Sequence, residues 1–182
     1  TMAKISNVSA YPNITNIDSS DYLIITDAEN NLMTKTCTLA TLQSLFGIDT
    51  VVTKVAVTNA QLATIFTTPV TLIPSPGAGK VLDIMSVMIS FDAGNTVYDF
   101  GAGNVLNLET NNIPQFNINI GTLNSATDLI AKLEINSAAA SQINLPSGVP
   151  LVLQANSANP TQGNGLLYLN IFHRVLTVGT EF

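Results

Sequence analysis

From Val51 to the C-terminal end of the chain, short runs of alternating apolar and polar residues are separated by turn signals. The clearest run is 115–120, where Phe116, Ile118 and Ile120 occupy every second position. Such a period of two is typical of a strand with one buried face. About eight or nine short strands, spaced roughly 8 to 12 residues apart, predict an all-β fold, specifically an antiparallel β-sandwich or jelly roll.

Local signals place the individual elements of this domain. Thr58-Asn-Ala-Gln61 is a capping box that opens a short helix. Asp92-Ala-Gly-Asn95 predicts a hairpin turn into a strand over 96–100. Residues 126–135 fit either a short helix or a strand, and the pattern leaves both open. The other expected strands cover 51–57, 70–73, 81–91, 105–108, 115–120, 149–155 and 166–178.

The run 81–91 is apolar on both faces apart from Asp83, Ser86 and Ser90. A strand with two apolar faces is expected to be covered on both sides. In a sandwich only one side meets the core, so the other is predicted to meet a neighbouring subunit or a docked N-terminal arm. The residues predicted to make core or subunit contacts are Met85, Val87, Met88 and Ile89.

The N-terminal segment is organised differently from the rest. A polar extended stretch over 5–21 leads into a predicted hairpin, 22–27 and 32–38, and then into a leucine-rich helix that Thr38 caps and Gly47 ends. These parts bury too little apolar surface to fold alone, so they must dock on something larger. The predicted division is 1–48 and 49–182, and the predicted docking residues are Ile5, Ile14, Ile17, Leu23 and Ile25.

The composition restricts the class of partner. Charged residues make up only 10% of the chain, against roughly 25% in ordinary soluble domains. Such a surface has weak protection against association, which favours coverage by copies of the chain or by a larger assembly; an ordinary Thr- and Asn-rich β protein is the alternative. The net charge of −6 and the six scattered Lys and Arg residues argue against nucleic-acid binding.

Catalytic and metal chemistry find little support in the sequence. Cys37 is the only cysteine and His173 the only histidine, which lies within an apolar strand and is expected to be packed. Gly77-Ala-Gly-Lys80 lacks the first glycine and the Ser or Thr of a phosphate loop, so it is expected to be a turn. We therefore predict no catalytic residue, no metal site, no cofactor and no enzyme activity.

Three acidic residues follow or precede turns: Asp92, Asp99 and Glu109. Such carboxylates can gather around a calcium ion or a sugar hydroxyl, but solvated turn residues are the favoured interpretation. No apolar run approaches the roughly eighteen residues of a membrane helix, and no secretory signal is visible. We therefore expect a protein made in the cytoplasm without membrane insertion.

The order of the N-terminal parts resembles a known module. Ile5-Ser6, Asp21 with its apolar strand, Thr34-Lys-Thr36 and the leucine-rich helix are similar to the N-terminal module of structural proteins of tailed-bacteriophage particles, notably head and tail fibres. The main domain likewise resembles a β-sandwich of phage structural proteins, through residues 61–81 and 167–175.

This resemblance implies a non-enzymatic virion structural protein, made in the bacterial host cytoplasm. It implies a homotrimer that the N-terminal module attaches to other virion proteins of the capsid or tail. A short head fibre or capsid decoration is slightly favoured over a tail fibre, because nothing long or repetitive follows the sandwich.

Two rival functions stay open. The first is a receptor- or carbohydrate-binding module of a tail fibre, with a host-surface glycan site on the loops 94–103 or 156–165. The second is a hydrolase of host polysaccharide, for which the sequence offers no convincing carboxylate pair.

Overall fold

The computed structural model describes residues 20, 22–27, 33–39, 41–42, 50–135 and 145–179. The chain divides into two compact units, Thr1–Asp49 and Thr50–Phe182. Of the N-terminal predictions, the arm over 5–19 and the end of the helix at 43–47 lie outside the described residues. So do three of the predicted docking residues, Ile5, Ile14 and Ile17.

The described part of the first unit is a β-hairpin followed by the start of a helix. β1 (Tyr22–Asp27) pairs antiparallel with β2 (Met33–Thr38). The Thr41 amide donates to Thr38 Oγ1 at 3.1 Å, which satisfies one of the free N–H groups of the first helical turn. The predicted hairpin and the predicted cap at Thr38 are therefore confirmed.

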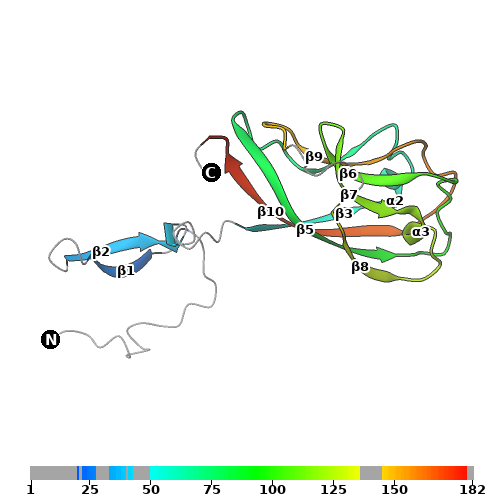
Figure 1. Ribbon diagram of the computed structural model, residues 1–182. Helices are drawn as coiled ribbons and strands as arrows, with labels where there is room; N and C mark the ends of the chain where they lie inside the picture. The colour runs from blue at the N-terminus through cyan, green and yellow to red at the C-terminus, as the bar shows by residue number, and fades with distance from the viewer. Residues whose placement is uncertain are drawn as a thin grey trace, which may run out of the picture. The chain divides into compact units, whose positions relative to one another are not determined.

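The second unit contains eight strands in two four-stranded antiparallel sheets (Figure 1). One sheet has the order β3-β10-β5-β8 and the other the order β4-β9-β6-β7. This distribution of eight consecutive strands over two sheets is that of a jelly roll, so the all-β prediction is confirmed. The bounds are β3 (Val51–Val57), β4 (Val70–Ile73), β5 (Lys80–Asp92), β6 (Val105–Thr110), β7 (Ile113–Asn119), β8 (Leu129–Leu133), β9 (Leu151–Ala155) and β10 (Leu166–Thr177).

Two short helices occupy connections between the sheets. α2 (Asn59–Leu62) has the predicted capping box, because Thr58 Oγ1 accepts from the Gln61 amide and Gln61 Oε1 accepts from the Thr58 amide. α3 (Ile120–Leu123) begins after Asn119, whose side chain accepts from the Gly121 amide at 2.8 Å. The cap at Asn119 ends the strand one residue before the predicted position.

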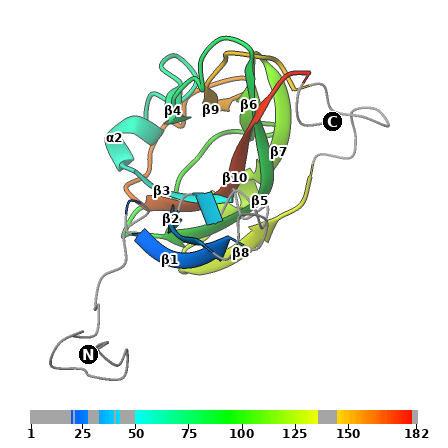
Figure 2. The ribbon, with the colours of Figure 1, turned by 90° about the vertical axis from the view of Figure 1, so that its left-hand side faces the viewer.

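The hydrophobic core lies between the two sheets, which form the two layers seen end-on in Figure 2. Alternate residues of each strand point into it, as the pattern predicted. β10 illustrates this alternation, since Leu167, Leu169 and Ile171 are fully buried while Tyr168 and Asn170 are exposed.

A β-bulge at Met85 explains why β5 seemed apolar on both faces. Phe172 of β10 lies opposite Ser86, but His173 lies opposite Ile84, so Met85 has no partner in the register. An extra residue reverses the alternation of the strand at that point. Both halves of β5 consequently turn their apolar residues inward: Leu82, Ile84, Val87, Ile89 and Phe91.

The structure corrects one prediction of local structure and decides between two alternatives for another. The strand predicted over 96–100 is wrong: this segment is a loop, in which Tyr98 and Phe100 are buried against the core. The predicted hairpin fails because β5 pairs with β8 and β10 instead of the segment that follows it. Between the two interpretations of 126–135, the structure selects a strand, β8.

Tyr98 and Gly163 generate a stability prediction. A Cβ on Gly163 would overlap the Tyr98 ring, and Gly163 has a φ of +135° that L side chains rarely adopt. We expect Gly163→Ala to lower the free energy of unfolding by roughly 3 kcal/mol, measured by urea denaturation. Gly101→Ala is the control, because its φ of +73° is also left-handed but open space surrounds its Cβ position. It should cost only about 1 kcal/mol; equal losses would contradict the steric argument.

Candidate interaction surface

The sheet β3-β10-β5-β8 has an outer face that is not part of the core. The register aligns its outward residues in rows, with Tyr168 between Ala56 and Ser90, and Asn170 between Lys54 and Met88. Ser90 and Met88 in turn lie opposite Ile130 and Lys132 of β8. We use "outer face" for this set: Val52, Lys54, Ala56, Met85, Met88, Ile130, Lys132, Tyr168, Asn170 and Phe172.

Large apolar side chains are exposed on this face and not on the other sheet. Ile130 is 74% exposed, and Met85, Tyr168, Val52 and Met88 are exposed by 38–48%. None of the exposed large hydrophobic residues of the described chain lies in β4, β9, β6 or β7. An antiparallel sheet can present one polar face to water, so the apolar residues gathered on this outward face make it the candidate interaction surface.

The basic residues of the described jelly-roll unit share the same sheet. Lys54, Lys80, Lys132 and Arg174 lie on β3, β5, β8 and β10 respectively. Arg174 Nε donates to Asp83 Oδ2 at 2.7 Å, whereas Lys54 and Lys132 form no ion pair within the described residues. The outer face therefore combines apolar side chains with two uncompensated ammonium groups.

The residues predicted to make core or subunit contacts separate into two pairs. Val87 and Ile89 point into the core and are at most 1% exposed, while Met85 and Met88 lie on the outer face. Sequence reasoning missed Tyr168, Ile130 and Val52. Each of these residues is apolar but occupies one of the alternate strand positions that point away from the core. That pattern was the sequence signal for an exposed apolar face.

The two predicted docking residues that can be described lie in β1. Leu23 is 38% exposed, and Ile25 pairs with Lys35 in the register of the hairpin. Their predicted role in attachment stays a prediction.

The two loops predicted to hold a ligand bind to each other. The Thr161 amide donates to the Asp99 carbonyl at 2.9 Å, and the Asn164 amide donates to the Thr96 carbonyl at 3.1 Å. Asn164 Oδ1 also accepts from the amides of Asn95 and Thr96. We call these segments, 93–104 and 156–165, the "paired loops". Many of their polar groups form hydrogen bonds within or between the two loops. Their ligand-binding role stays a prediction.

The three acidic residues considered for a metal or sugar site do not converge. Asp92 and Asp99 accept amide hydrogens within turns at the paired loops, from Gly94 and Gly101. Glu109 lies near the opposite end of β6 and is buried, which raises its pKa, while a hydrogen bond from Asn107 lowers it. Within the described residues, no three His, Cys, Asp or Glu side chains are grouped closely enough to hold a metal ion.

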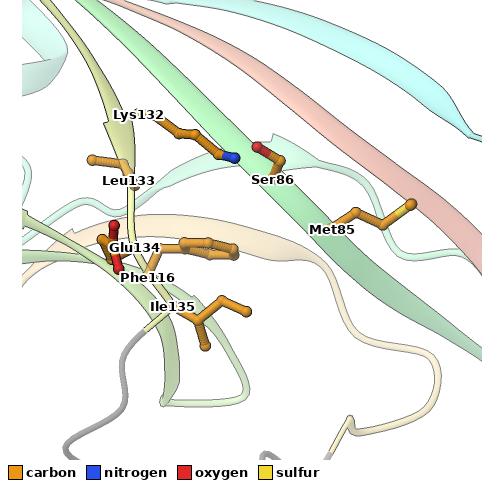
Figure 3. Close-up of a pocket in the computed structure, with 7 residues that line it drawn as sticks. All are labelled: Met85, Ser86, Phe116, Lys132, Leu133, Glu134 and Ile135. Atoms are coloured by element: carbon orange, nitrogen blue, oxygen red, sulfur yellow. The ribbon is translucent and has the colours of Figure 1, made fainter.

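A surface cavity of about 430 Å³ lies beside the outer face, where β8 ends (Figure 3). The Lys132 side chain extends toward Ser86 along one side of it, and the Phe116 ring lies below. Its lining offers one ammonium, one carboxylate and one hydroxyl, but no imidazole or thiol to act as a base or nucleophile. The lining residues are Met85, Ser86, Phe116, Lys132, Leu133, Glu134 and Ile135.

His173 is buried in the core side of β10. Its Nε2 lies 2.9 Å from Thr53 Oγ1, and its Nδ1 has no hydrogen-bond partner. Burial lowers the pKa of His173, because the charged imidazolium loses its hydration. The imidazole therefore supports packing between β3 and β10 and is not presented to a substrate.

In comparisons with known proteins, no family model, no curated protein and no solved structure matches this chain. None of the helices among the described residues has the length and apolar character needed to cross a membrane.

The buried imidazole predicts a pH dependence of stability. Because its folded pKa lies below the unfolded value of about 6.5, the unfolded chain binds the proton first as the pH falls. His173 thus leaves stability unaffected above about pH 6.5 and reduces it below, with a slope of at most ~1.4 kcal/mol per pH unit.

His173→Leu tests this prediction, with chemical denaturation measured from pH 5 to 8. The variant should lose less stability than the wild type on acidification, whatever its stability at pH 8. Glu109 is the opposing group, since its raised pKa makes the folded state gain stability on acidification. Glu109→Gln should leave the His173 component unchanged; identical acid slopes for the wild type and His173→Leu would refute the assignment.

Proposed function

We propose that this chain is a non-enzymatic structural protein of a bacteriophage particle. Its jelly-roll unit self-associates, as a homotrimer, and its N-terminal segment attaches it to other virion proteins. A head fibre or capsid decoration is the proposed location. The observation that carries the proposal is the one-sided exposure of apolar side chains on the outer face.

The size of the outer face agrees with a role in assembly. Strands about 4.8 Å apart and about seven residues long make a four-stranded face of roughly 20 by 23 Å. This is roughly 450 Å², while a stable interface buries about 800 Å² on each partner. The face can supply more than half of one partner's share, so a further surface must contribute.

The N-terminal unit supports attachment for a different reason. A two-stranded hairpin is marginal in water by itself and needs packing against another body. The hairpin β1-β2 belongs to a unit separate from the jelly roll, and Tyr22 and Leu23 on it are exposed. Its resemblance to the attachment module of phage fibres supports the proposal that it docks on the particle. The jelly-roll fold by itself does not distinguish this function from others, since lectins and capsid proteins both have this fold.

Self-association is tested by light scattering on the purified protein. We expect a mass three times that of the 19.2 kDa chain at micromolar concentration. Met88→Ser combined with Tyr168→Ser should shift the protein toward the monomer, because both side chains are exposed and their loss leaves the core intact. Thr71→Ser combined with Asn117→Ser, on the exposed side of the other sheet, is the matched control. A wild type that stays monomeric would count decisively against the proposal.

Attachment is tested by deleting residues 1–48. The remaining jelly roll should keep its strand content by circular dichroism and its oligomeric mass, because its core is self-contained. It should no longer be incorporated into particles assembled in its presence, measured by mass spectrometry of purified virions. Truncated protein found in particles at the full-length level would overturn the role of this segment.

A further inference from the structure

Acidic residues gather at one end of the jelly-roll unit. Its described basic residues all lie on the sheet of the outer face, and three acidic residues lie together at the end of the sandwich where β5 ends and β8 begins, while Asp83 and Glu134 lie on or beside that sheet away from this end. Asp92 ends β5 opposite Leu166, Asp128 immediately precedes β8, and Asp99 lies in the paired loops. We call this the acidic end: Asp92, Asp99 and Asp128.

The acidic end has carboxylate oxygens available to a partner. Asp92 and Asp128 each use Oδ1 to accept one amide, from Gly94 and Ala93 respectively. All three acidic side chains are exposed, and none forms an ion pair within the described residues. The turns thus hold the carboxylates in place. Oδ2 of Asp92 and of Asp128 accepts no hydrogen bond within the described residues, whereas Asp99 Oδ2 accepts from Thr161 Oγ1 at 3.5 Å.

Packing the outer face against the same face of another copy would be unfavourable. It would bring Lys54 and Lys132 of each copy against those of the next, while Asp83 already pairs with Arg174 and Glu134 lies at the edge of the face, in the cavity beside Lys132. Like charges placed together in an interface oppose association. A closed ring of three copies also needs two different surfaces on each copy.

We infer that the contact between copies is heterologous: the outer face of one jelly roll receives the acidic end of the next. Lys54 and Lys132 pair with the carboxylates of Asp92, Asp99 and Asp128, while Tyr168, Met88 and Ile130 supply the apolar centre of the contact. This inference rests on the proposed self-association and specifies its two surfaces. It also provides the additional buried area that the outer face alone lacks.

Charge substitution separates this contact from other modes of association. Lys54→Glu combined with Lys132→Glu should weaken oligomerisation at least about tenfold in sedimentation equilibrium, because the face then repels the acidic end. Lys80→Glu is the control, since it changes the same charge on an exposed residue of the same sheet outside the outer face. It should change the association constant by less than about threefold.

The opposite surface is tested by Asp92→Asn combined with Asp128→Asn. Asparagine keeps the oxygen that accepts the turn amide, so the loops should stay folded while the charge is lost. Association should weaken, and its dependence on salt should decrease relative to the wild type. An oligomer that is insensitive to both double substitutions would overturn the inference and leave the proposed self-association standing.

Zero-length cross-linking of lysine to carboxylate locates the contact directly. A mixture of unlabelled and ¹⁵N-labelled protein should give mixed-isotope peptides that join Lys54 or Lys132 to a residue of the acidic end. Intermolecular links from these lysines only to other carboxylates would refute the assignment. A wild type that is monomeric throughout would overturn both the inference and the proposed function.

Discussion

The register of β5 determines both surfaces of its sheet. This strand lies between β10 and β8, so its side chains contribute to the core and to the outer face along thirteen residues. The bulge at Met85 turns Leu82 and Ile84 inward together with Val87, Ile89 and Phe91. Strict alternation from Phe91 backward would bury Met85 and Asp83 instead and expose Ile84. Core packing and the composition of the outer face therefore both depend on one unpaired residue.

Much of the fold was predictable because its signals are local. Alternation identified β3, β7 and β10, and the spacing of Thr58 and Gln61 identified the cap of α2. The bulge was not predictable, since it is visible only in the pairing with β10, which lies about ninety residues further along the chain. The strand predicted at Tyr98 failed for a similar reason. Tyr98 and Phe100 alternate as in a strand, but Tyr98 packs on Phe91 and Gly163, and Phe100 packs on Tyr98.

Only part of the outer face could be predicted from the sequence. Met85 and Met88 were singled out for their strand, but Val87 and Ile89 in the same run are core residues. The other members of the outer face come from strands far apart in the chain, and only the order β3-β10-β5-β8 makes them neighbours. Side-by-side placement of strands is a property of topology, which alternation within one strand cannot report.

The paired loops constrain how this end of the molecule can change. Asn164 Oδ1 holds two amides of the opposite loop, and the Tyr98 ring occupies the space that a side chain at position 163 would need. A residue inserted in one loop would displace hydrogen-bond partners in the other, although each loop is long and superficially tolerant. A change of length or sequence in one loop should therefore require a change in the other. Relatives of this protein should accordingly differ from it in both loops or in neither loop.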